Sequence, residues 1–156
     1  MNISPNKLVI RRLLKHDRTQ VFSALTDPAK MAKWFYGMET GQAKVTVDLR
    51  PGGNFEIVML SEKGEEECKP NGIYLEIAPP ERVVFTWTSE GSVKDTKVAI
   101  ELFERDGGTE LVLTHELPPD MIAPHRQGWT NCLIHLEALL SSGRRVDPAS
   151  PNCLGI

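Results

Sequence analysis

One change in hydrophobic period constrains the fold of this chain more than any other feature. Between residues 43 and 115, apolar side chains mostly alternate with polar ones, which is typical of half-buried β-strands. Between Asp120 and Leu140, apolar side chains recur every three or four residues, which is typical of an amphipathic helix. The sequence therefore predicts consecutive strands followed by one helix, which at about 1.5 Å per residue would span roughly 30 Å.

Tight turns separate the predicted strands. Residues 50–53 read Arg-Pro-Gly-Gly and residues 106–108 read Asp-Gly-Gly, and both compositions favour turns. Because short turns join antiparallel neighbours, we expect an antiparallel sheet. The expected strands are 6–14, 43–48, 55–59, 73–77, 83–87, 98–102 and 111–115.

The alternation within 73–77 assigns faces to its side chains. It predicts that Ile73, Leu75 and Ile77 face the core and that Tyr74 faces away. A bulge after Pro70-Asn71 would instead turn Tyr74 inward.

Two short helices are expected between the first two strands. Asp17 is suited to cap the first helix, and Asp27-Pro28 is suited to begin the second, because proline is tolerated at the first helical position. The second helix is expected to end at Gly37. The apolar residues of the two helices are Val21, Phe22 and Leu25, then Met31, Trp34 and Phe35.

Length and composition indicate one globular domain. The 156 residues fit a domain at 1–140, followed by a Ser-, Pro- and Gly-rich tail at 141–156 that we expect to be flexible. The net charge of -3 argues against non-specific nucleic-acid binding. No apolar run approaches the roughly 20 residues of a membrane span, and no secretory signal is recognisable. Three widely spaced cysteines favour a reducing environment, so we expect a cytoplasmic protein.

A family resemblance is carried by segments spread from about Asn6 to Leu140. The segments are Val21–Pro28 with Trp34, Asp48–Gly53, Gly72–Ile77, Pro80–Trp87, Gly107–Leu111 and His125–Trp129. Their order and spacing resemble the START-like, or helix-grip, superfamily. Within it, they resemble the branch named after the C-terminal domain of the activator of the Hsp90 ATPase.

The resemblance implies an α+β fold with a ligand cavity. In this fold a curved antiparallel sheet of about six or seven strands wraps around a long C-terminal helix, with two short helices after the first strand. The wider superfamily holds lipids, hormones or polyketide intermediates between sheet and helix, and homodimers are consistent with it. The expected lining residues are Trp34, Phe55, Ile57, Met59, Tyr74, Phe85, Trp87, Val98, Leu113, His115, Trp129 and Leu133.

His115 is the one candidate for acid–base chemistry. It alternates in register with Leu111 and Leu113, so it is expected to face inward. It could transfer a proton or orient a ligand, but a structural hydrogen bond is the favoured interpretation. Spacing among His125, Cys132 and His135 does not match a metal site, and no cofactor motif is recognisable.

Three functions remain open from the sequence. The first is binding of a small apolar or aromatic molecule, with buried tryptophans whose indole N–H groups need partners. The second is a chaperone-associated module that binds another protein, for which the acidic segment 62–67 is the sequence argument. The third is a cyclase, isomerase or hydrolase that uses the same cavity. A filled core would favour the second function.

Overall fold

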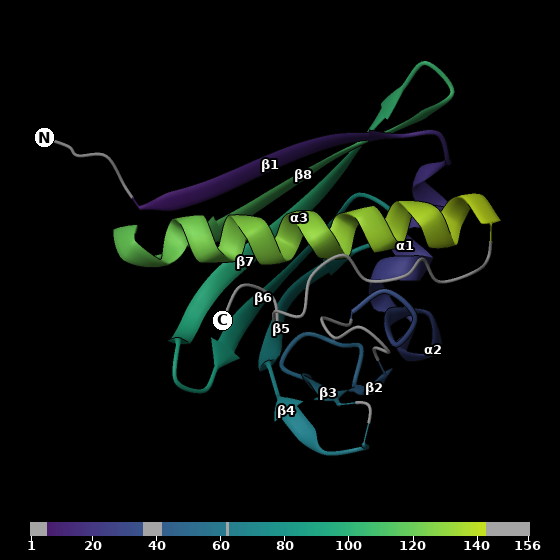
Figure 1. The fold of residues 1–156 in the computed structure, drawn as a ribbon. Helices are drawn as coiled ribbons and strands as arrows, with labels where there is room; N and C mark the ends of the chain where they lie inside the picture. The colour runs from purple at the N-terminus through teal and green to yellow at the C-terminus, as the bar shows by residue number, and fades with distance from the viewer. Residues whose placement is uncertain (1–5, 36–41, 62, 143–156) are drawn as a thin grey trace, which may run out of the picture.

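The computed structural model describes residues 6–35, 42–61 and 63–142, and within them an antiparallel sheet carries a long helix across one face (Figure 1). The sheet order is β1-β8-β7-β6-β5-β3-β2, and β4 also pairs with β3. The α+β helix-grip prediction is confirmed. The elements are β1 (Lys7–Leu14), α1 (Arg18–Thr26), α2 (Pro28–Met31), β2 (Gln42–Val47), β3 (Asn54–Leu60), β4 (Glu66–Cys68), β5 (Asn71–Ala78), β6 (Arg82–Ser89), β7 (Val93–Arg105), β8 (Gly108–Glu116) and α3 (Pro119–Ser142).

The two short helices begin where the sequence predicts. The side chain of Asp17 accepts a hydrogen bond from the backbone N–H of Gln20, and the side chain of Asp27 accepts one from Ala29. However, α2 is a single turn, because the backbone N–H groups of Lys33 and Trp34 bond to carbonyls three residues earlier. Trp34 and Phe35 therefore follow the helix instead of belonging to it. The expected helix end at Gly37 lies outside the described residues.

Strand β4 begins in the acidic segment 62–67 and is not among the strands expected from the sequence. It pairs with the end of β3, and the register shifts there between Met59 and Leu60. A run of charged residues carries no apolar alternation, so the period gave no sign of this strand. At the other end of the chain, α3 continues to Ser142, two residues beyond the predicted domain boundary at 140, and the rest of the predicted tail lies outside the described residues.

Tyr74 corrects the predicted faces of β5. Its side chain is only 3% exposed, whereas Ile73 and Leu75 are 47% and 50% exposed. The pairing of β5 with β6 shifts register between Tyr74 and Glu76, and beyond this irregularity Ile77 packs against the core. The prediction that Ile73 and Leu75 face the core was wrong, because the bulge lies inside the strand and not before it.

Gly72 allows β5 to approach its neighbours closely. A Cβ at this position would collide with the backbone carbonyl oxygen of Thr86 and would lie 2.8 Å from the ring of Phe55. We expect Gly72→Ala to lower the free energy of unfolding by about 3 kcal/mol, at the upper end of overpacking costs, because a backbone atom cannot rotate away. Urea denaturation measures this loss.

Gly64→Ala is the control for that substitution. Gly64 has a φ of 82° in a turn, and an added Cβ would meet nothing within 4 Å. The control therefore reports only the cost of a left-handed backbone, about 1–2 kcal/mol. Equal losses for the two variants would contradict the steric argument for Gly72.

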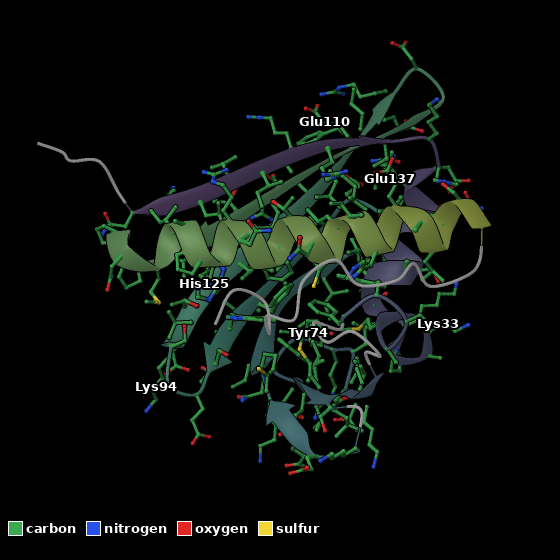
Figure 2. The ribbon with its side chains drawn as sticks, in the orientation of Figure 1. Lys33, Tyr74, Lys94, Glu110, His125 and Glu137 are labelled. Carbon is green, nitrogen blue, oxygen red and sulfur yellow. The ribbon has the colours of Figure 1, made fainter. Side chains whose placement is uncertain are left out.

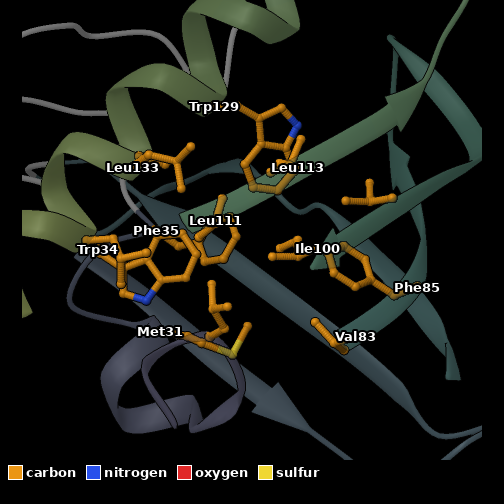
Figure 3. Close-up of a cluster of buried hydrophobic side chains, with 14 of the residues drawn as sticks. Met31, Trp34, Phe35, Val83, Phe85, Ile100, Leu111, Leu113, Trp129 and Leu133 are labelled. Carbon is orange, nitrogen blue, oxygen red and sulfur yellow. The ribbon is translucent and has the colours of Figure 1, made fainter. Parts of the chain in front are cut away.

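The core lies between α3, the α1–α2 segment and the facing side of the sheet (Figure 3). α3 contributes Trp129, Cys132, Leu133 and Leu136, all fully buried. Cys132 is a buried thiol, whereas Cys68 is disulfide-bonded, which differs from the expectation of reduced cysteines. The ten apolar residues expected to face inward are all buried: Trp34, Phe55, Ile57, Met59, Phe85, Trp87, Val98, Leu113, Trp129 and Leu133.

Candidate functional site

An apolar pocket lies between the α1–α2 segment and the sheet. Its free volume is about 10 Å³, which is close to the minimum for one water molecule and far below the roughly 300–1,000 Å³ of typical ligand pockets. In the described chain the pocket is thus nearly filled by its own side chains. The lining residues are Leu25, Met31, Trp34, Phe35, Phe55, Ile57, Tyr74, Val83, Phe85, Trp87 and Ile100.

Aromatic rings in mutual contact form most of the wall. Phe35 stacks on Trp34 with ring centroids 4.0 Å apart and lies 6.1 Å from Trp87. On the sheet, Phe55 lies 5.3 Å from Phe85 in an edge-to-face arrangement and 5.4 Å from Tyr74. Figure 3 shows Met31, Trp34 and Phe35 facing Val83, Phe85 and Ile100 across this cluster. Such surroundings favour flat, apolar molecules.

Only part of the predicted lining meets at this pocket. Trp34, Phe55, Ile57, Tyr74, Phe85 and Trp87 line it, whereas Met59, Val98, Leu113, His115, Trp129 and Leu133 are buried in the core away from its walls. The prediction missed Leu25, Met31, Phe35, Val83 and Ile100. Met31 and Phe35 share a helical stripe with Trp34 in the sequence, so the period alone could have found them.

The three tryptophans differ in the hydrogen bonding of their indole N–H groups, although all three side chains are fully buried. The N–H of Trp34 donates to the carbonyl oxygen of Ala24 at 2.8 Å, and that of Trp129 donates to Nδ1 of His115 at 3.1 Å. The N–H of Trp87 has no partner among the described residues. Among the three tryptophans, Trp87 is therefore the exception to the rule that buried polar groups are bonded.

His115 lies in the middle of a directed chain of hydrogen bonds. Because Nδ1 accepts from Trp129, the ring proton is on Nε2, which donates to Oγ1 of Thr96 at 2.8 Å. The Thr96 hydroxyl in turn donates to the carbonyl oxygen of Trp87 at 2.7 Å. Both ring nitrogens of His115 are thus engaged within the protein, as the favoured structural interpretation requires.

His125 packs against His115 from α3. The two rings are edge to face with centroids 5.3 Å apart, and Nδ1 of His125 donates to the carbonyl oxygen of Met121 at 2.9 Å. Burial, together with the nearby His125, lowers the pKa of His115 to about 3. Burial also lowers the pKa of His125, although the Met121 carbonyl acts in the opposite direction. Both rings are therefore neutral at pH 7.

Tyr74 brings a hydroxyl group to the pocket. Burial raises the pKa of Tyr74 to about 12, so its hydroxyl stays protonated at pH 7. Figure 2 shows Tyr74 well apart from His125 on α3. The polar groups of the pocket lining are thus a neutral phenol and the tryptophan N–H groups, which can donate hydrogen bonds but cannot exchange protons near neutral pH.

The described residues contain neither a cluster of metal-ligating side chains nor a membrane-spanning helix. In residues 6–35, 42–61 and 63–142, no three His, Cys, Asp or Glu side chains are grouped so that they could hold a metal ion. In the same residues, no helix has the length and apolar character needed to cross a membrane.

Solved structures with the same fold come from several bacteria. A protein from Nitrosomonas europaea is 26% identical, with a TM-score of 0.75 over 92% of this chain and 100% of that chain. A protein from Chromobacterium violaceum is 28% identical, with a TM-score of 0.73 over 88% of this chain and 98% of that chain. An AHSA1-like protein from Aeromonas hydrophila, 21% identical with a TM-score of 0.79 over 88% and 93% of the two chains, shares the fold.

Sequence comparison identifies the branch within this fold. No curated protein sequence matches the chain significantly. The family model described as "Activator of Hsp90 ATPase homolog 1-like protein" matches residues 15–141, which include the α1–α2 segment, the sheet from β2 onward and nearly all of α3. The chain therefore belongs to the family of Activator of Hsp90 ATPase homolog 1-like proteins.

Proposed function

We propose that this protein binds a small apolar or aromatic molecule in the pocket between α1–α2 and the sheet. The observation that carries the proposal is the lining itself, in which six aromatic side chains from the turn after α2 and from three strands meet and no charged residue takes part. Burial of apolar surface at about 25 cal/mol per Å² would supply most of the binding free energy.

Binding requires the pocket to widen, because its free volume in this structure is about 10 Å³. The side chains best placed to move are Met31 and Phe35. Met31 is unbranched and adopts many rotamers, and Phe35 follows a one-turn helix that contacts α1 and β2. A ligand would take the place of these side chains against the rings of the sheet, so its own ring would restore the stacking that opening disrupts.

A panel of neutral aromatics from benzene to substituted naphthalenes tests the proposal by thermal unfolding. A compound that binds the folded state raises the melting temperature with its concentration. We expect naphthalene-sized compounds to stabilise the wild type, and Phe35→Ala to bind benzene as well, since an apolar cavity of about 150 Å³ holds benzene.

Phe103→Ala is the matched control for Phe35→Ala. Phe103 is an exposed ring at the end of β7, outside the pocket. This variant should bind the panel as the wild type does. If the compounds stabilise only Phe35→Ala, they bind a cavity created by the substitution, and the proposal is contradicted. The proposal is also contradicted if no compound stabilises the wild type or either variant.

A protein-interaction role is the second candidate, and the nearly filled pocket favours it. The exposed side chains of Ile73 and Leu75 add apolar surface on the outer face of β5. An enzymatic role has less support, because both nitrogens of His115 are bonded within the protein. If the aromatic panel fails, Ile73→Ser and Leu75→Ser provide the variants for pull-down experiments with chaperone-type partners.

A further inference from the structure

Trp87 occupies a position where a ligand could satisfy an unmet hydrogen bond. Its ring lines the pocket, is fully buried and has an N–H without a partner among the described residues. Buried indole N–H groups usually find an acceptor, as those of Trp34 and Trp129 do here. Trp34 and Trp87 both line the pocket, and of the three tryptophans only Trp87 has an N–H without a partner among the described residues.

The surroundings of Trp87 explain why the protein does not supply the acceptor. The neighbouring rings are aromatic, with Trp129 at 5.0 Å, Phe35 at 6.1 Å and Phe55 at 6.2 Å between centroids. These rings offer no oxygen or nitrogen lone pair in their planes. The backbone carbonyl oxygen of Trp87 itself is occupied by the hydroxyl of Thr96. The ring of His115, at 6.3 Å, already uses its Nδ1 to accept from Trp129. Among the described residues no acceptor reaches the N–H of Trp87, and a molecule placed in the pocket would supply one.

We infer that the ligand of this pocket is a neutral aromatic or alicyclic molecule that carries a carbonyl or ether oxygen, and that this oxygen accepts the Nε1–H of Trp87. The inference rests on the proposed function and adds the chemistry of the ligand to it. A carboxylate is excluded, because the pocket lining contains no cation to compensate a buried charge. The Tyr74 hydroxyl provides a second neutral donor on the same wall.

Two probes of nearly equal shape test the role of the oxygen. 2-Acetylnaphthalene carries a ketone oxygen where 2-ethylnaphthalene carries only hydrogens. Each is titrated into ¹⁵N-labelled protein, and the three indole N–H resonances are followed together with the dissociation constant. We expect the ketone to bind about tenfold more tightly, the gain of one hydrogen bond. It should shift the Trp87 resonance downfield, whereas those of Trp34 and Trp129 move much less.

Variants distinguish the hydrogen bond from the shape of the ring. Trp87→Phe, which also assigns the resonance, should bind the two probes with equal affinity. Trp129→Phe, which removes an N–H bonded to His115 on a ring that does not line the pocket, should keep the tenfold preference. Equal binding of both probes to the wild type with an unmoved Trp87 resonance overturns this inference and leaves the proposed pocket intact. Binding of neither probe overturns the proposed function as well.

Discussion

Replacing Trp129 by alanine is expected to lower the free energy of unfolding by roughly 3–5 kcal/mol, the range measured for truncating large core aromatics. Trp129 is fully buried, its ring contacts those of Phe35 and Trp87, and its N–H supports His115. Truncation would therefore remove packing between α3 and the sheet and would also leave Nδ1 of His115 without its donor. Urea denaturation at pH 7 measures the loss.

Two further variants divide this loss into its parts. Trp129→Phe keeps a ring but removes the donor, so we expect a loss of about 1–3 kcal/mol from the unsatisfied His115 nitrogen. Ile134→Ala, at an exposed position of the same helix, should change the stability by less than about 1 kcal/mol. A Trp129→Ala loss as small as that of Ile134→Ala would contradict the packing described between α3 and the sheet.

Acidification is expected to destabilise the protein through His115. Its pKa is about 3 in the folded state and 6.5 in the unfolded reference, so the unfolded chain takes up the proton first. The stabilising contribution is complete above pH 6.5 and falls between pH 6.5 and pH 3, by about 1.4 kcal/mol for each pH unit. The lowered pKa of His125 acts in the same direction.

Urea midpoints measured from pH 7 to pH 4 for the wild type and His115→Gln isolate this contribution. The glutamine amide can still accept from Trp129 but does not titrate, so the stability gap between the two proteins should narrow steadily as the pH falls. His16→Gln controls for the loss of a histidine elsewhere in the chain. A gap that stays constant over this range would mean that His115 is protonated in the folded protein as easily as in the unfolded chain.

The elements with strong periodicity could be predicted from the sequence. The stripe of Trp129, Leu133 and Leu136 placed α3 correctly, and Asp17 and Asp27 marked the starts of both short helices. These signals are local, because a cap or a helical face is specified by residues within a few positions of each other. Local information was therefore enough for these helices, whereas the wrapping of the sheet around α3 was expected from the family resemblance.

The pocket could be predicted only in part, because it depends on packing between distant segments. The bulge beyond Tyr74 is a mismatch between β5 and β6 and leaves no mark on the sequence of either strand. His115 and Trp129 were correctly expected to be buried. The sequence pattern, however, could not show whether these two side chains bond to each other or contact a ligand. That the N–H of Trp87 lacks a partner follows from the rings that surround it in space, so it could not be predicted from the sequence.

The hydrogen bonds through His115 hold the sheet wall of the pocket more firmly than the α1–α2 wall. One directed chain runs from Trp129 on α3 through β8 and β7 to β6, so sliding α3 by one turn would leave a donor and an acceptor unsatisfied in a dry interior. The one-turn helix α2 has no such anchor among its described bonds to the sheet. Widening to admit a ligand should therefore move α2 against a stationary sheet and α3.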